Sequence, residues 1–146
     1  MPMIDVTAGA GTFADKPGLV KALTAAMMKW EQVPLIDMFT DNTAAFIHEL
    51  PADAFGDANG DSNHIRVNVL TPVGILDREK KLGVTRELTE IVVAAAGNPG
   101  LAARTWVLIA ETPDGGWGLG GHAYTNAEIA AEARRIEREG INEALF

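Results

Sequence analysis

An internal repeat constrains the fold of this chain more than any other feature of its sequence. Residues 2–11, PMIDVTAGAG, align with residues 65–74, IRVNVLTPVG, and residues 49–56, ELPADAFG, align with residues 111–118, ETPDGGWG. The two alignments agree with each other after a gap of one residue. Self-similarity of this kind indicates a duplicated supersecondary unit. We therefore expect a single domain over residues 1–146, built from tandem units at 2–60 and 65–122.

Each unit has the pattern of a strand, a helix and a second strand. Short apolar runs predict strands at residues 3–8, 43–50, 64–70 and 104–111, and longer amphipathic stretches predict helices at 16–31, 77–96 and about 126–139. A crossover between parallel strands is right-handed in nearly all proteins, so both unit helices should lie on one face of a four-stranded sheet. The expected fold class is α+β: two tandem β-α-β units with an added C-terminal helix.

The helix boundaries are supported by residues that start and stop helices. Asp15 can cap the helix at 16–31, and Pro17 falls in its first turn. Gly97 is placed to end the helix at 77–96. The stretch TNAE, with Thr125 and Glu128, forms a capping box that opens the C-terminal helix.

Two strongly apolar strands predict an oligomer. The stretches VNVL and WVLIA are nearly continuous in apolar residues, which is typical of strands buried on both faces. Two helices can cover only one face of the sheet. We therefore expect another copy of the chain to cover the other face.

The charge balance and the residue types present exclude several classes of function. Twelve Lys and Arg residues stand against 20 Asp and Glu residues, for a net charge of −8. Nucleic acids and anionic membrane surfaces require clustered basic residues, so neither is an expected partner. The chain has no cysteine, which excludes disulfides and thiolate chemistry. Because the sequence shows no leader pattern and no apolar run of membrane-spanning length, we expect a cytoplasmic protein.

No cofactor is expected, neither a metal ion nor a dinucleotide. The three histidines, His48, His64 and His122, have no metal-ligand spacing. The stretch GWGLGG contains the pattern G-x-G-x-x-G, but no helix follows it directly and no later strand completes a β-α-β unit. These glycines are typical of a tight hairpin, which we expect at a subunit interface.

Pro2 directly precedes the first predicted strand and allows two interpretations. Proline lacks an amide N–H and is tolerated at the first residue of a strand. Alternatively, removal of Met1 makes Pro2 a secondary amine at the chain terminus. A terminal amine titrates nearer neutrality than a lysine and burial lowers its pKa further, so this group could serve as a general base.

Taken together, these features resemble the tautomerase superfamily, whose members are built from β-α-β units and use an amino-terminal proline in catalysis. The resemblance covers most of the chain. It is most specific in WVLIAETPDGGWGLGG, residues 106–121, which is similar to the second strand and following hairpin of 4-oxalocrotonate tautomerase. Two fused units per chain resemble the malonate semialdehyde decarboxylase and cis-3-chloroacrylic acid dehalogenase families. The resemblance implies a homotrimer.

The resemblance also implies catalytic residues. It makes Pro2 the catalytic base. The stretch VPLIDMF is similar to the segment that holds the decarboxylase aspartate, which makes Asp37 the counterpart of that residue. The other interpretation of Asp37 is an aspartate that caps a loop at the exit of the helix.

The same resemblance implies a pocket without a carboxylate clamp. Family members bind carboxylates with arginines, whose planar fork suits that task. Here Thr12, Pro72 and Ile75 stand in the turns where arginines are expected, and Trp106 stands at a further arginine position. The resulting substrate-binding pocket, lined by Trp106, Trp117, Ile75 and Pro72, suits an aromatic or uncharged carbonyl compound. Trp117 is equally well interpreted as a core aromatic.

The leading hypothesis is an isomerase that moves a proton between the keto and enol forms of a small, weakly charged carbonyl compound, with Pro2 as the base. Decarboxylation of a β-keto acid, assisted by Asp37, is a variant of it. The alternative is a non-catalytic trimeric scaffold or small-ligand binder of the same fold. The state of Met1 separates these readings, because a retained Met1 turns the Pro2 nitrogen into an amide with no basicity.

Overall fold

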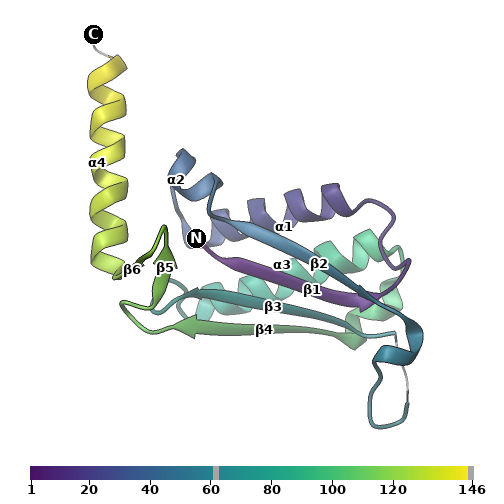
Figure 1. Ribbon diagram of the computed structural model, residues 1–146. Helices are drawn as coiled ribbons and strands as arrows, with labels where there is room; N and C mark the ends of the chain where they lie inside the picture. The colour runs from purple at the N-terminus through teal and green to yellow at the C-terminus, as the bar shows by residue number, and fades with distance from the viewer. Residues whose placement is uncertain (61–62, 145–146) are drawn as a thin grey trace.

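The computed structural model describes residues 1–60 and 63–144, and its main body is a four-stranded sheet (Figure 1). The strands are β1 (Met3–Gly9), β2 (Ala44–Leu50), β3 (Ile65–Pro72) and β4 (Thr105–Thr112), in the order β2-β1-β3-β4. β1 pairs in parallel with β2, and β3 with β4, whereas the central pair β1–β3 is antiparallel. Each unit is therefore a parallel β-α-β, and the two units meet at the middle of the sheet.

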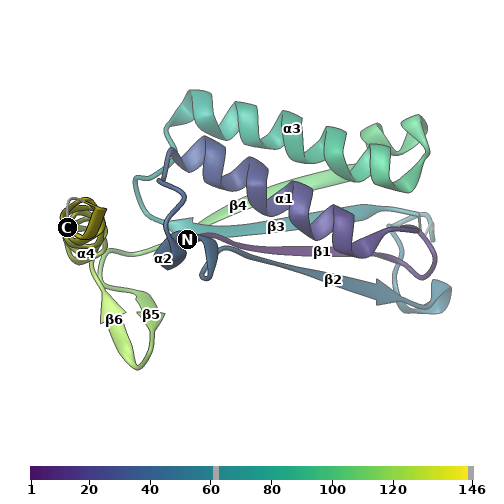
Figure 2. The same ribbon diagram turned by 90° about the horizontal axis from the view of Figure 1, so that it is seen from above.

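Both unit helices pack on the same face of this sheet (Figure 2). α1 (Lys16–Glu31) is capped by Asp15, whose side chain accepts a hydrogen bond from the Gly18 amide at 3.0 Å. α3 (Arg78–Ala96) is capped in the same way by Asp77 and ends at Gly97, which adopts a left-handed conformation. The predicted fold class, the two tandem units and the one-sided placement of the helices are confirmed.

The core lies between the sheet and these two helices. Its fully buried members include alternate residues of the central strands and the inner faces of the helices: Ile4, Val6, Val67, Val69, Leu23, Met27, Val84 and Leu88. The helices touch closely at Gly83, where a Cβ atom would lie 2.2 Å from the Trp30 ring. Trp30 also donates a hydrogen bond to Glu87 at 2.6 Å, which ties α1 to α3.

Smaller elements surround one end of the sheet. The connection after α1 contains a short helix, α2 (Asp37–Thr40), and 3-10 turns occur at η1 (Ala52–Ala54) and η2 (Pro99–Arg104). The glycine-rich stretch forms the predicted hairpin, with strands β5 (Trp117–Leu119) and β6 (His122–Tyr124). Gly120 and Gly121 form its turn, with φ of 61° and 86° that favour glycine. Residues 61 and 62 of the turn-rich stretch after β2 lie outside the described residues.

The C-terminal helix is longer than predicted. α4 (Asn126–Ala144) opens with the expected capping box, in which the Glu128 amide bonds the Thr125 hydroxyl at 3.1 Å. Its first turns lie beside the hairpin, and the rest extends away from the sheet (Figure 1). No helix in the described part of the chain is long and apolar enough to cross a membrane.

Among the described residues, no helix packs on the second face of the sheet (Figure 2). Large apolar side chains stand exposed on it: Phe46, Leu70, Trp106 and Leu108. A polar pair, Asp5 and His48, lies among them at 2.7 Å. Coverage of this face by a further subunit stays a prediction.

Candidate active site

The amino terminus of the chain lies inside the protein. The Met1 ammonium donates a hydrogen bond to Glu31 Oε1 at 2.9 Å, and the Met1 and Glu31 side chains are both 1% exposed. The second oxygen of Glu31, Oε2, accepts a hydrogen bond from the Thr71 hydroxyl at 2.6 Å. The start of β1 therefore carries a buried ammonium–carboxylate pair.

Three elements bring these groups together. Met3 pairs with Leu70 across the antiparallel centre of the sheet, so the start of β1 lies beside the end of β3, where Thr71 is. Glu31 is the last residue of α1 and follows Met27 by one helical turn, so it continues the buried stripe of that helix. The helix thus delivers a carboxylate to the point where the sheet places the amino terminus.

A cavity of about 160 Å³ adjoins this pair. Its wall is mostly apolar and comes from five elements or their flanks, with Val33, Phe39, Pro72, Ile75 and Ile129 among the lining residues. Glu31 and Asn126 are the polar side chains among the described lining residues. Ligand pockets typically measure roughly 300–1,000 Å³, so the cavity is small while Met1 occupies its edge.

Four of the six sequence-predicted site residues lie at or next to this cavity. Pro72 and Ile75 line it. Pro2 is buried directly after Met1, and its carbonyl accepts a hydrogen bond from the Ala44 amide at 3.2 Å. Trp117 is 7% exposed and packs in one apolar cluster with Met1. The structure thus brings together Pro2, Pro72, Ile75 and Trp117.

The other two predicted residues lie elsewhere. Asp37 is exposed at the first residue of α2 and does not line the cavity, because the buried side of that short helix is occupied by Phe39. Trp106 pairs with Arg66 near the start of β4, at the opposite end of the sheet from Met1. It is 47% exposed and stacks on His64, with ring centroids 4.6 Å apart. Within one chain, Trp106 cannot join the cavity.

Sequence reasoning missed Glu31, although a signal for it exists. Leu19, Leu23 and Met27 recur every four residues along the buried stripe of α1, and Glu31 continues the same spacing. A carboxylate at a buried helix position needs a charged or hydrogen-bonding partner. That spacing could have marked Glu31 as a residue facing a polar group inside the protein.

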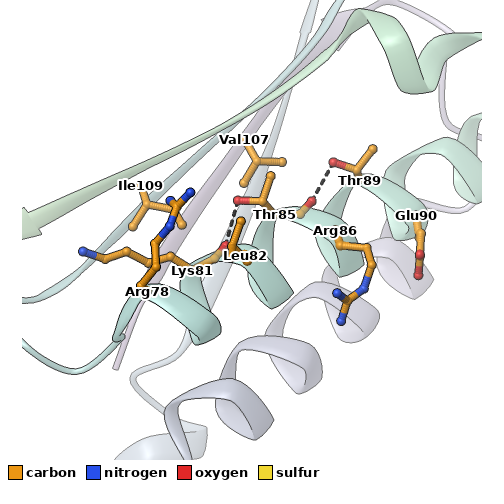
Figure 3. A pocket seen from close by; sticks show the side chains of 9 residues that line it. All are labelled: Arg78, Lys81, Leu82, Thr85, Arg86, Thr89, Glu90, Val107 and Ile109. Carbon is orange, nitrogen blue, oxygen red and sulfur yellow. Dashed lines mark hydrogen bonds between the residues drawn. The ribbon is translucent and has the colours of Figure 1, made fainter.

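A larger hollow of about 700 Å³ is an open groove between α3 and β4 (Figure 3). Thr85 and Thr89 face it, and their hydroxyls donate to backbone carbonyls one turn earlier, at 2.8 and 2.7 Å. None of the residues that line this groove is a buried polar residue. In the described part of the chain, no group of three His, Asp or Glu side chains could hold a metal ion. The cavity at the amino terminus is therefore the candidate site.

One family of known proteins matches part of the sequence. Residues 64–127, which include the whole second unit, match the family described as "Tautomerase enzyme". Among curated proteins, none matches the sequence closely enough to count as a relative.

Solved structures match almost the whole chain. A wild-type fused 4-OT, determined as a symmetric trimer, superposes with a TM-score of 0.71 at 19% identity, covering 87% of this chain and 98% of that one. A member of the cis-3-chloroacrylic acid dehalogenase family gives 0.70 at 17% identity, covering 94% and 96%. A macrophage migration inhibitory factor-like protein from Entamoeba histolytica gives 0.67 at 12% identity, covering 84% and 98%.

At these identities the structural likeness establishes the fold alone. Together with the family match over the second unit, it confirms the resemblance of this chain to the tautomerase superfamily and to its fused, two-unit members.

Proposed function

We propose that this chain, once Met1 is removed, is a tautomerase that uses the Pro2 amine to move a proton between the keto and enol forms of a small carbonyl compound. The observation that supports it is a buried amino terminus beside a mostly apolar cavity. Loss of Met1 makes Pro2 the terminal residue and adds the volume of a methionine to that cavity. The hydrogen bond from the Ala44 amide to the Pro2 carbonyl then holds the start of β1 in place.

The apolar part of the surroundings suits a neutral amine acting as a base. Phe39 lines the cavity and Trp117 packs in the same apolar cluster as Met1, so both limit access of water to the terminus. In the proposed reaction the Pro2 nitrogen takes a proton from the carbon next to the carbonyl, and the C–H electron pair forms the C=C bond of the enol. The carbonyl π pair moves to the oxygen, which takes up a proton to complete the enol. Proton transfer of this kind contributes roughly 10²–10⁴-fold when the base is well placed.

A non-catalytic role is the alternative that applies if Met1 is retained. In the structure Met1 fills the edge of the cavity, and its ammonium is paired with Glu31. A protein that retains Met1 has no basic nitrogen at Pro2 and a cavity too small for most ligands. The decarboxylase variant has less support, because Asp37 lies outside the cavity.

The test starts with intact mass spectrometry of the purified chain, which determines whether Met1 is present. Met1-free protein is then assayed on phenylenolpyruvate, 2-hydroxymuconate and malonate semialdehyde. In a variant with one alanine inserted before Pro2, the nitrogen is acylated, and we expect the rate to fall by about 10²-fold or more with no change in the circular dichroism spectrum. Full activity in the alanine-inserted protein would contradict the proposal.

The oligomeric state is proposed from the open face of the sheet. Phe46, Trp106 and Leu108 are about half exposed on that face, and the fused 4-OT with the same fold is a trimer. We expect light scattering to give a trimer that Phe46→Glu weakens or dissociates, because it places a charge in the contact. A stable mass near 15.5 kDa for the unmodified protein would contradict the trimer.

A further inference from the structure

The buried carboxylate of Glu31 is the polar group that the proposed reaction does not yet use. We propose that Glu31 binds the substrate: it accepts a hydrogen bond from the hydroxyl of a neutral enol or phenol, and it makes the site reject carboxylates. This inference rests on the proposed function to the extent that the ligand enters the space left by Met1.

The first argument is hydrogen bonding. Thr71 satisfies Oε2 of Glu31, and the Met1 ammonium satisfies Oε1. Removal of Met1 takes away the partner of Oε1 while the Thr71 bond keeps the carboxylate in place. A buried carboxylate oxygen without a partner is strongly unfavourable. The cavity therefore favours a ligand that places a hydrogen-bond donor where the Met1 nitrogen was.

The second argument is charge. Apart from the terminal amine, Glu31 is the one charged side chain among the described residues that line the cavity. A ligand carboxylate would enter a mostly apolar cavity beside a fixed negative charge. No arginine or lysine lines the described wall to offset that repulsion. A neutral ligand with a hydroxyl avoids the repulsion and gains a hydrogen bond to an ionised acceptor, which is stronger than one to a neutral acceptor.

The Glu31 carboxylate and the Pro2 nitrogen are placed to act on neighbouring atoms of one substrate. The nitrogen that bonds Glu31 in the structure belongs to Met1, and the Pro2 nitrogen follows it by one residue. A substrate hydroxyl at the former position of the Met1 nitrogen leaves the Pro2 nitrogen free to face the neighbouring carbon. In the direction from enol to ketone, Glu31 takes the proton of the O–H bond. The electron pair of that bond forms the carbonyl, and the C=C pair takes a proton from the Pro2 ammonium. Return of the proton from Glu31 to Pro2 completes the cycle.

Turnover of a matched substrate pair tests the inference. Phenylenolpyruvate and its methyl ester share the same enol and differ in the carboxylate. For the Met1-free protein we expect kcat/KM to favour the ester by about tenfold or more, because the acid brings a second negative charge into the cavity beside Glu31. Glu31→Gln keeps the shape of the side chain and should bring the two values close to each other. Asp41→Asn makes the same charge change at an exposed residue just after α2 and should leave the preference intact. A wild-type preference for the acid, or an unchanged preference in Glu31→Gln, overturns the inference.

Binding without turnover separates this inference from the proposed function. Calorimetry with phenol and benzoate should show phenol binding to Met1-free protein and no benzoate binding, and no binding of either to protein that retains Met1. Glu31→Gln should weaken phenol binding, and Thr71→Val should weaken it less, with thermal melting confirming that both variants fold. If this pattern holds but no substrate is turned over, the inference stands and the proposed function fails. If the Met1-free protein turns over substrate but discriminates no better than Glu31→Gln, only the inference fails.

Discussion

The two β-α-β units share their scaffold in detail. Gly11 and Gly74 both follow the first strand of their unit, and both have positive φ, 83° and 80°. Each second strand ends near a glutamate paired with a lysine from the helix that precedes that strand: Lys16–Glu49 at 2.9 Å and Lys81–Glu111 at 2.6 Å. Duplication has therefore preserved the turns and ion pairs that hold each strand to its helix.

The units differ at the other end, where each first strand begins. The repeat aligns Met1 with His64, and the two helices end with Glu31 and Ala96, each followed by a left-handed residue. His64 lies beside the Asp57 carboxylate at 3.5 Å and stacks on Trp106. The second unit thus has an imidazole in mid-chain where the first has a chain terminus, and an alanine where the first has the carboxylate.

This difference shows where function can reside in a duplicated chain. An amine at the start of a strand is available only once, at the start of the chain. The family match falls on residues 64–127, in the second unit, whereas Pro2 and Glu31 belong to the first. The family match therefore falls on the unit that does not contain the candidate chemistry.

The largest effect should come from breaking the buried pair that distinguishes the first unit. In protein that retains Met1, released from a cleavable amino-terminal fusion, Glu31→Gln leaves the buried ammonium without its carboxylate. Removing one partner of a buried ion pair costs about 3–5 kcal/mol, so we expect the free energy of unfolding to fall by that amount in urea titrations. In Met1-free protein the same substitution should cost much less, because that ammonium is absent. Equal losses in the two forms would show that Glu31 stabilises the fold by other contacts.

Local patterns in the sequence predicted the scaffold well and the site only in part. The helix at 16–31 matches α1, because its cap and its apolar stripe are both local signals. The short helix α2 was not predicted, since its four residues are too few to form a periodic pattern. The missed helix is one whose formation depends on its neighbours in the fold.

The two acidic residues after Met28 illustrate the limit for the site. The motif around Asp37 predicts a functional aspartate, but a local motif does not determine which side of a four-residue helix faces inward. Glu31 carries no motif, and its role depends on where β1 begins and β3 ends. Trp106 was predicted to line the pocket from the family resemblance alone, whereas the pairing of β4 with β3 puts this residue at the opposite end of the sheet from Met1. The geometry of the site is therefore set by long-range pairing that the sequence pattern does not contain.

A second prediction tests whether the two scaffolds are equally rigid. Val6 and Val69 occupy corresponding positions of the repeat, and both are buried at 1% exposure or less. Truncation of either to alanine removes two methyl groups from the core, and we expect each to lower the free energy of unfolding by about 2 kcal/mol. Urea titrations of Val6→Ala and Val69→Ala provide the comparison. A much smaller loss at Val6 would mean that the unit holding the candidate site is packed more loosely than its copy.

The smallest effect should come from the ion pairs that the units share. The Lys16 ammonium bonded to Glu49 lowers the pKa of that carboxyl below its usual 4.5, and Lys81 does the same for Glu111. A lowered folded-state pKa means that the ionised form stabilises the protein above about pH 4.5, and that this contribution is lost as the pH falls through the lowered pKa. Both pairs are solvent-accessible and screened, so each contribution is modest.

We expect Glu49→Gln and Glu111→Gln to lower the free energy of unfolding slightly and equally at pH 7. At pH 3 the free energy of unfolding of each variant should lie closer to that of the unmodified protein. The Gly74 amide also bonds Glu111 at 3.1 Å, and Gly11 has the matching position beside Glu49, so equal responses are expected from the whole turn. A pH-dependent loss at one glutamate but not at the other would break the symmetry that the turns and strand ends otherwise keep.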